Sequence, residues 1–190
     1  MKLLEEKIIK EGKVLPGNIL KVGSFLNQQI DTELLREIGT EISRLYSGCG
    51  VTKILTIESS GIAVAVAAGI IMNVPVIFAK KHQSSNVDGS VYTASAHSYT
   101  HNTDYNMVIS RDYLTSDDHI LLVDDFLAVG NALNGLISLV EQSGATLVGA
   151  AIEIEKAFQG GGDELRARGI RVESLAMIER MTDTEVIFRR

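Results

Sequence analysis

Short hydrophobic runs recur along the chain and alternate with longer amphipathic stretches. The runs are rich in Val, Ile and Leu, and their lengths are typical of buried strands. We expect strands at 52–57, 75–79, 119–124, 146–154 and 171–177. Apolar residues between the runs recur at helical spacing, as Leu133, Leu136 and Val140 do. The helices predicted on this basis are 61–72, 131–142 and 163–168.

This alternation predicts an α/β fold in which flanking crossover helices join the strands of a parallel β-sheet core. Another helix is expected after Asp31, a suitable N-cap, because Ile38, Ile42 and Leu45 fall on one face. The chain has 190 residues, of which 45% are hydrophobic, so it can bury one substantial core. We therefore expect a single domain that spans residues 1–190.

Two segments depart from this alternation. Residues 80–105 are polar, rich in Ser and Thr, and too long for an ordinary connection, which favours a long flexible lid loop with a weak hairpin around Val91–Ser95. Residues 15–30 lie between the first and second helices and are expected to form a small N-terminal cap, or hood, over one end of the sheet. Both segments are candidates for binding a ligand.

Charge and cysteine content limit the classes of function. Acidic residues outnumber basic ones by 24 to 18, and the net charge of −6 disfavours a general nucleic-acid binder. Cys49 is the only cysteine, which excludes an internal disulfide and fits a reducing compartment. The opening MKLLEEKIIKEG is too charged for a signal peptide, and Asn73 and Pro75 interrupt the apolar stretch 61–79. Neither export nor membrane insertion is expected.

Two adjacent carboxylates follow the hydrophobic run ILLV. Asp124 and Asp125 should lie at the carboxyl end of a parallel strand, where ligands bind in open α/β sheets. A loop up to Gly130 then leads into a helix near Asn131, and the free N–H groups of a helix start can hold a phosphate. The carboxylates suit hydroxyls or a divalent ion on the same ligand. This pattern fits a sugar phosphate, but aspartates that end a strand and cap a helix explain it equally well.

A second candidate anion site follows the first core strand. Ser59, Ser60 and Gly61 provide two hydroxyls in a turn, and amides are free where the next helix starts. An N-cap serine before a packed helix is the alternative. Lys80 and Lys81, which open the lid segment, are the obvious candidates to supply positive charge to this site. Solvated lysines are the alternative here, more so for Lys80 than for Lys81.

The segment LLVDDFLAVGNA resembles the ribose-5-phosphate motif of the type I phosphoribosyltransferases, in which two acids precede a phosphate-binding loop. The resemblance implies that Asp124 and Asp125 hold ribose hydroxyls. Val129 and Ala132 stand where the family usually has hydroxyl residues, so phosphate binding would depend on backbone amides and one asparagine side chain. The residues assigned to the phosphate are Ala128, Val129, Gly130, Asn131 and Ala132.

The family resemblance also implies that the turn at Ser59–Gly61 meets pyrophosphate and that Lys81 reaches it, from the same or the partner subunit. Three separated segments, LPGNILKVGSFLNQQID, KKHQSSN and EIEKAFQGG, make nearly the whole chain similar to the bacterial xanthine phosphoribosyltransferases. This implies a cytoplasmic homodimer that converts xanthine and 5-phosphoribosyl 1-pyrophosphate (PRPP) into xanthosine 5′-monophosphate (XMP) and pyrophosphate. Mg²⁺ would accompany PRPP, bound mainly through pyrophosphate, ribose and water rather than directly by protein ligands.

The same resemblance places Leu20, Asn27 and Lys156 around the base. Lysine only donates hydrogen bonds, which favours ring carbonyl groups and hence an oxopurine over adenine. The alternatives are an enzyme that prefers guanine or hypoxanthine, a regulatory protein that senses PRPP, and a sugar-phosphate binding module without catalysis. His97 and His101 have a spacing suited to a zinc site on a helix, but their segment does not read as helical.

Overall fold

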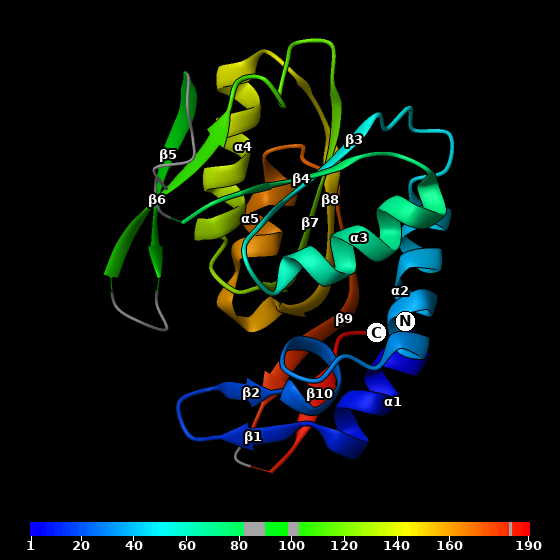
Figure 1. The fold of residues 1–190 in the computed structure, drawn as a ribbon. Helices are drawn as coiled ribbons and strands as arrows, with labels where there is room; N and C mark the ends of the chain where they lie inside the picture. Colours follow the sequence, from blue (N-terminus) through cyan, green and yellow to red (C-terminus); the bar gives the residue numbers. More distant parts are fainter. Residues whose placement is uncertain (82–89, 99–102, 183) are drawn as a thin grey trace.

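A computed structural model of the protein describes residues 1–81, 90–98, 103–182 and 184–190. Within these residues the core is a six-stranded sheet in the order β10-β9-β8-β7-β3-β4 (Figure 1). The five strands β3, β4, β7, β8 and β9 run parallel, and β10 pairs antiparallel with β9. Their bounds are β3 (Lys53–Ile57), β4 (Val76–Ala79), β7 (His119–Leu127), β8 (Thr146–Lys156), β9 (Val172–Met181) and β10 (Val186–Phe188).

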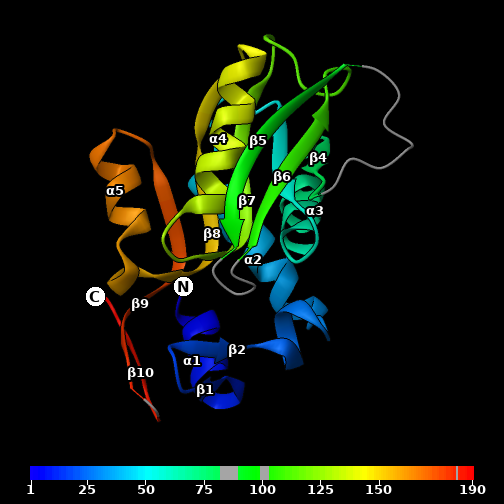
Figure 2. The same cartoon turned by 90° about the vertical axis from the view of Figure 1, so that its left-hand side faces the viewer.

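Helices cover both faces of this sheet (Figures 1 and 2). The helices α2 (Thr32–Leu45) and α3 (Gly61–Met72) lie on one face, and α4 (Asn131–Ser143) and α5 (Gly161–Ala167) lie on the other. Asp31 caps α2 as expected, because its carboxylate accepts a hydrogen bond from the Leu34 N–H at 3.1 Å. None of the described helices combines the length and the apolar character that a membrane span needs.

Each face of the sheet has its own apolar core. Ile38 and Ile42 of α2 pack with Leu121 of β7 in one cluster. On the opposite face, Leu136 of α4 packs with the next residue of the same strand, Leu122. Neighbouring residues of a strand point to opposite faces, so a strand between two helical layers must be apolar throughout. This requirement explains the uninterrupted hydrophobic runs of the sequence.

The connections reverse direction between the two central strands. The chain passes from β3 through α3 to β4 on one side, and from β7 through α4 to β8 on the other. The segments that follow β3 and β7 therefore diverge at the carboxyl edge of the sheet. Open α/β sheets bind ligands at this reversal point, and the sequence places both candidate anion sites there.

A small lobe lies beyond the carboxyl edge of the sheet. It contains α1 (Lys2–Glu11), the hairpin of β1 (Lys13–Leu15) and β2 (Ile19–Lys21), and the π-helical turn η1 (Gly23–Asn27), with β10 beside them (Figure 1). Phe25 is fully buried and joins the lobe to the core. The two chain ends also meet near it, where Arg190 pairs with Glu5 at 3.2 Å. The expected hood at 15–30 is the middle of this larger lobe.

The polar segment expected as a lid contains a hairpin of β5 (Val91–Ser98) and β6 (Thr103–Ser110). The expected weak hairpin is thus confirmed and is longer than predicted. It packs across α4 (Figure 2), and a bridge between Lys80 and Val108 ties its base to the main body. His97 lies in β5, whereas residues 82–89 and 99–102 of the expected lid, with His101, lie outside the described residues.

Most predicted elements agree with the structure to within a few residues, and one difference concerns the site. The strand expected to end at 124 continues to Leu127, so Asp124 and Asp125 lie in β7 and not in a loop. The reason is pairing on one side only: β3 stops pairing with β7 at Leu122, whereas β8 pairs with it as far as Leu127. The short helix expected at 163–168 begins earlier, at Gly161, and β10 was not predicted.

Candidate active site

The two adjacent acids lie where β7 has lost one neighbouring strand. Asp124 is 6% exposed, and the Asp125 N–H donates a hydrogen bond to Asp124 Oδ1 at 3.0 Å. Burial, and then the charge of Asp125, raises the pKa of Asp124 well above its ordinary value, and burial also raises the pKa of Asp125. A ligand that offers hydroxyl donors or a cation would stabilise the ionised pair.

A third acid, which sequence reasoning missed, lies beside this pair. Glu153 is on β8, only 3% exposed, and burial followed by the charges of Asp125 and Asp124 raises its pKa well above the ordinary value. Its signal in the sequence is that it lies between the apolar residues Ile152 and Ile154 in a strand expected to be buried on both faces, so that it must point into the protein. Three carboxyl groups therefore share one poorly solvated region, which favours the protonated form of at least some of them.

The turn after β3 lies directly against the acid pair. A Cβ on Gly61 would be 2.7 Å from Asp124 Oδ1 and would also clash with the Thr56 hydroxyl, so only glycine allows this approach. Ser60 precedes α3 and makes no capping hydrogen bond with its side chain. The first amides of α3 have no partner inside the helix. The turn formed by Ser59, Ser60 and Gly61 thus lies next to Asp124 through Gly61, and the Ile62 N–H at the start of α3 is bonded to the Ser59 carbonyl at 3.2 Å.

Lys81 is held close to the acids by its own backbone. Its N–H donates to the Glu58 carboxylate at 2.6 Å, and its Nζ lies 5.5 Å from the centre of the Tyr105 ring. The positive charge of Lys81 favours the ionised form of Asp124. Burial, and then Asp124, raises the pKa of Tyr105. Tyr105 was not expected in the site, because nothing in a polar segment shows which residue a hairpin turns inward.

The short connection from β7 to α4 is shaped by two glycines. Gly130 has φ +89°, which favours glycine, and its carbonyl accepts the Asn134 N–H at 2.8 Å to start α4. Behind it, the Gly161 N–H donates to the Ala128 carbonyl at 3.1 Å, and a Cβ on Gly161 would be 2.5 Å from that oxygen. The loop formed by residues 128–132 is therefore supported from behind by the start of α5.

The three residues expected around a base come from the hood and from β8. Asn27 lies near the Asp125 carboxylate, and its side chain favours the ionised form of that group. Lys156, at the end of β8, donates from Nζ to the Asn18 carbonyl at 2.9 Å and lies 5.7 Å from the centre of the Phe126 ring. Burial lowers the pKa of Lys156. Leu20 is 7% exposed and lines, with Asn27, a pocket of about 370 Å³.

The structure thus brings Asn27 to the acid pair and Lys156 to the adjacent strand end beside Phe126, and it places Leu20 in the hood beside Asn27. Asn18 and Phe126 are additional neighbours of Lys156 that the sequence did not reveal. The signal for Asn18 lies in its turn, because Gly17 and Asn18 both have positive φ and form a tight connection between β1 and β2.

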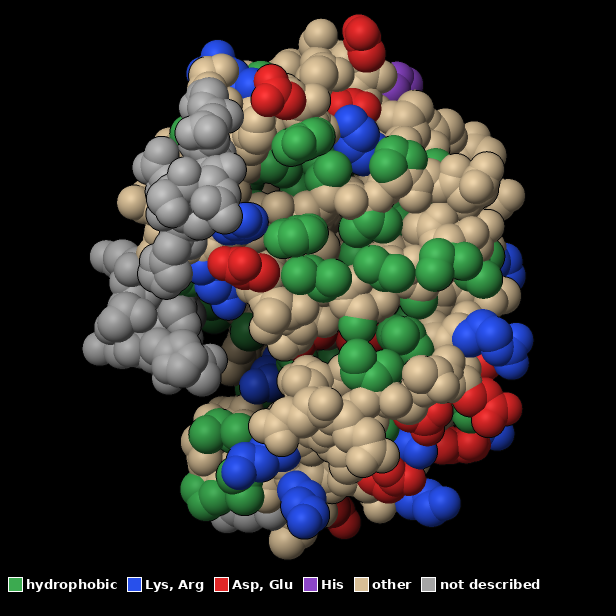
Figure 3. Space-filling model, in the orientation of Figure 1, with side chains coloured by type: hydrophobic (Ala, Val, Ile, Leu, Met, Phe, Trp, Pro, Cys, Tyr) green, Lys and Arg blue, Asp and Glu red, His purple; other side chains and the backbone are tan. Residues whose placement is uncertain are grey.

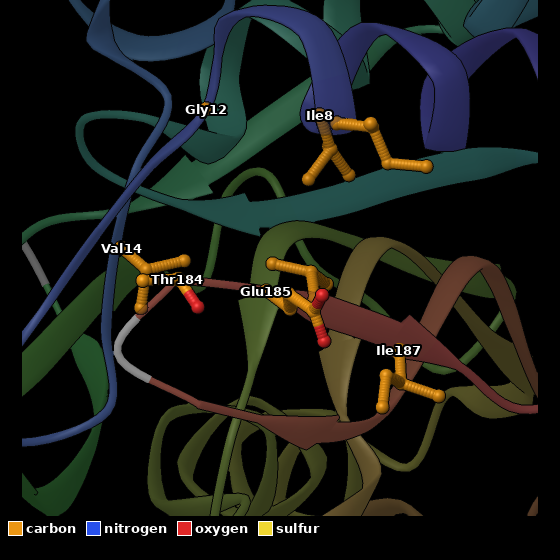
Figure 4. Close-up of a pocket in the computed structure, with 8 residues that line it drawn as sticks. Ile8, Gly12, Val14, Thr184, Glu185 and Ile187 are labelled. Atoms are coloured by element: carbon orange, nitrogen blue, oxygen red, sulfur yellow. The ribbon is translucent and has the colours of Figure 1, made fainter.

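A separate pocket of about 310 Å³ lies between α1 and β10 (Figure 4). Ile8, Val14 and Ile187 give it an apolar lining, with Glu185 at one side. None of its lining residues belongs to the expected site. Across the described residues there is also no cluster of three or more His, Cys, Asp or Glu side chains that could hold a metal ion. The candidate active site is the edge of the sheet at Asp124, because the acid pair lies there with Lys81 and the turn at Gly61 beside it.

Comparison with known proteins agrees with this location. Residues 23–185 match the model of the family described as "Phosphoribosyl transferase domain". The chain is 52% identical over 188 residues to the xanthine phosphoribosyltransferase of Limosilactobacillus reuteri, covering 99% of this chain and 98% of that protein. It is also 52% identical over 189 residues to the xanthine phosphoribosyltransferase of Pseudomonas syringae pv. syringae, with full coverage of both.

Solved structures with low sequence identity share the fold. The adenine phosphoribosyltransferase of Giardia lamblia, complexed with 9-deazaadenine, superposes with a TM-score of 0.78 at 19% identity and covers 93% of this chain and 98% of its own. That of Trypanosoma brucei, in complex with AMP, pyrophosphate and ribose-5-phosphate, gives 0.77 at 20% identity, covering 92% and 79%. The chain therefore belongs to the phosphoribosyl transferase domain family and has its type I fold.

Proposed function

We propose that this enzyme is a glycosyltransferase of the pentosyl class that transfers the phosphoribosyl group of PRPP to xanthine, with XMP and pyrophosphate as products. The observation that carries the proposal is the placement of Lys156 and the acid pair on the ends of adjacent strands, where the hood contacts Lys156 through Asn18 and approaches Asp125 through Asn27. Full-length identity of 48–52% to proteins named xanthine phosphoribosyltransferase supports the same activity.

Each part of PRPP has a matching group in the site. Asp124 and Asp125 accept hydrogen bonds from the ribose hydroxyls. Lys81 and the turn formed by Ser59, Ser60 and Gly61 bind the pyrophosphate. The 5-phosphate binds the amides of residues 128–132, where Val129 and Ala132 leave the backbone and Asn131 as donors. The hood, residues 15–30, covers the base, and the segment 80–105 closes over both substrates and excludes water.

The reaction needs no nucleophilic side chain. A nitrogen of the purine attacks the anomeric carbon while the bond from that carbon to the pyrophosphate oxygen breaks, and the electron pair leaves with pyrophosphate. The proton of the imidazole ring of xanthine is released to solvent or to the pyrophosphate. The ribose ring gains positive character in the transition state. The carboxylates of Asp124 and Asp125 stabilise that charge, and Lys81 meets the charge that develops on the leaving group.

Mg²⁺ fits this site as a partner of PRPP. The acid pair lies among poorly solvated groups that disfavour its ionised form, and a nearby cation would favour that form. Asp124 and Asp125 would contact the ion through water, and oxygens of ribose and pyrophosphate would supply its other ligands. When bound, the ion neutralises charge on the pyrophosphate. A cytoplasmic location and a homodimer belong to the same proposal.

Lys156 selects the base in this proposal. Its ammonium group donates to the 2-carbonyl of xanthine, whereas the 2-amino group of guanine would face it unfavourably. Hypoxanthine has no substituent at this position and would leave one donor of Lys156 without its partner. We therefore expect xanthine to be used faster than guanine or hypoxanthine, and adenine to be the poorest substrate.

The test is to supply the four purines separately with PRPP and Mg²⁺ and to follow nucleotide formation. Lys156→Gln should lower kcat/KM for xanthine by about tenfold to a hundredfold, because a charged hydrogen bond is lost, and should reduce the preference for xanthine. Lys53→Gln is the matched control, since Lys53 pairs with Asp118 at the opposite edge of the sheet. Turnover of none of the four bases would favour a PRPP sensor, and faster use of guanine or hypoxanthine would reassign the substrate.

A further inference from the structure

An ion pair with a buried carboxylate adjoins the base-selecting lysine. Glu155, the residue before Lys156, is fully buried, and its carboxylate accepts two hydrogen bonds from the Arg166 guanidinium, at 2.9 Å and 2.6 Å. The Ser174 hydroxyl donates to the same carboxylate. Arg166 Nε also donates to the Val172 carbonyl at 3.1 Å. The end of β8 is therefore fixed to α5 and to β9 by a fork-shaped contact.

The helix that carries Arg166 also touches the phosphate loop. At its first residue, Gly161 donates to the Ala128 carbonyl, and a Cβ there would be 2.5 Å from Val129 C and 2.7 Å from Gly130 N. The next residue, Gly162, packs so closely on the Glu155 carboxylate that it has no room for a side chain. Two neighbouring residues of α5 thus contact the two halves of the site, the loop after β7 and the end of β8.

Stability alone is a weak reason for such a pair. Burial of the Glu155 carboxylate carries a desolvation cost that offsets much of its attraction to Arg166, whose side chain is 28% exposed. The bidentate geometry instead fixes the relative position of the groups that it joins. Here those groups are the strand end that carries Lys156 and the helix that supports residues 128–132.

We propose that Arg166 is a positioning residue: through Glu155 and α5 it aligns Lys156 with the phosphate loop, so that base and PRPP are held in register. This inference rests on the proposed function. Arg166 touches neither substrate in this account. Its loss should therefore change substrate affinity and base preference more than it changes the chemical step.

The test uses the whole protein with Arg166→Met, and also Arg166→Met combined with Glu155→Gln, which avoids an unpaired buried carboxylate if the single variant folds poorly. We expect KM for xanthine and for PRPP to rise about tenfold and the preference for xanthine over guanine to fall. The change in kcat should be smaller, because the displaced groups, Lys156 and residues 128–132, bind the substrates and do not contact the bond that breaks.

Amide hydrogen exchange of residues 128–132 should become faster in both variants. Combination with Lys156→Gln should add little to the loss of selectivity, since both changes act through one lysine.

Matched controls separate positioning from simple destabilisation. Arg171→Gln removes another arginine that hydrogen-bonds an acid of β9, Glu173, at 2.9 Å. Arg171 precedes the amino end of β9, at the edge of the sheet opposite the site, so its loss should lower Tm without changing base preference. Gly161→Ala pushes directly on the loop and should raise KM for PRPP, whereas Gly160→Ala meets nothing within 4 Å and has only the strain of φ +81°.

Unchanged exchange at 128–132 together with unchanged base preference in the Arg166 variants would overturn the coupling, even if Tm falls. A wild-type protein that forms no XMP would instead overturn the proposed function. The exchange of residues 128–132 then decides the coupling by itself, because that measurement needs no substrate.

Discussion

Asp124, Asp125 and Glu153 make the candidate active site a source of pH-dependent instability. All three have pKa values raised above the ordinary 3.8 of aspartate and 4.5 of glutamate, with burial as the first cause. At pH values between the ordinary pKa values of the unfolded chain and the raised pKa values of the folded protein, the folded protein therefore binds more protons than the unfolded chain. Stability must fall as pH rises through that window, from about pH 4 upward, since the unfolded state releases its protons first.

Glu153→Gln tests this residue-scale argument. It removes one buried carboxyl group while keeping its shape, so we expect the free energy of unfolding at pH 7 to rise by about 1–2 kcal/mol. The decline in stability from pH 4 to pH 8 should also become shallower. Chemical denaturation at several pH values measures both effects.

The control is Glu6→Gln, because Glu6 has a side chain 61% exposed and should change stability by no more than about 0.5 kcal/mol. A Glu153→Gln variant that is less stable than the wild type at pH 7 would mean that Glu153 is ionised and well paired in the folded protein.

At the scale of elements, the sequence predicted what depends on local pattern. The central strands and the helices α2, α3 and α4 follow from apolar spacing and from the cap at Asp31, and the acid pair was expected at the correct edge of the sheet. The extension of β7 to Leu127 was not predictable by the rule that acids end strands, because it depends on pairing with β8 alone. β10 was not predicted because it is only three residues long, too short for a pattern, and lies at the edge of the described sheet beside β9.

The parts of the site that were missed depend on contacts between distant segments. Tyr105 reaches Lys81 because a hairpin folds back, and Asn18 meets Lys156 across 138 positions of sequence. The coupling through Arg166 needs the position of α5 against two loops. A single sequence carries no periodic signal for such contacts, whereas residues at strand ends, such as Asp124 and Lys156, can be placed from topology alone.

The packing of the β5–β6 hairpin against α4 gives a prediction at the scale of elements. A Cβ on Gly135 would lie 2.8 Å from the Met107 thioether, and Met107 is fully buried. Gly135→Val should therefore displace the hairpin, destabilise the protein by about 1–3 kcal/mol and speed proteolytic cleavage within residues 90–110. Met107→Ala in the same chain should restore part of the resistance to proteolysis. Cleavage at the wild-type rate in Gly135→Val would show that the contact between Gly135 and Met107 does not hold the hairpin against α4.

At the scale of the whole molecule, one face carries an apolar surface that is exposed among the described residues. Val66, Ile70 and Ile71 of α3 are 42%, 73% and 43% exposed, and Phe78 of β4 is 41% exposed. Figure 3 shows hydrophobic side chains gathered across the middle of this face. Contiguous apolar surface of this kind is typical of protein interfaces. The proposed homodimer would use this face.

Ile70→Asp tests that dimer and its link to the site. Ile70 is already exposed in the single chain, so the change should affect monomer stability little, while a desolvated carboxylate should weaken association by at least tenfold. Sedimentation over a range of concentrations measures the change in mass. Ile9→Asp is a matched control, because Ile9 is 66% exposed but lines the separate pocket beside β10.

Phe78 lies three positions before Lys81, so loss of the dimer should also raise KM for PRPP. A monomeric Ile70→Asp variant with unchanged KM would separate assembly from catalysis, and one that stays dimeric would move the interface to another face.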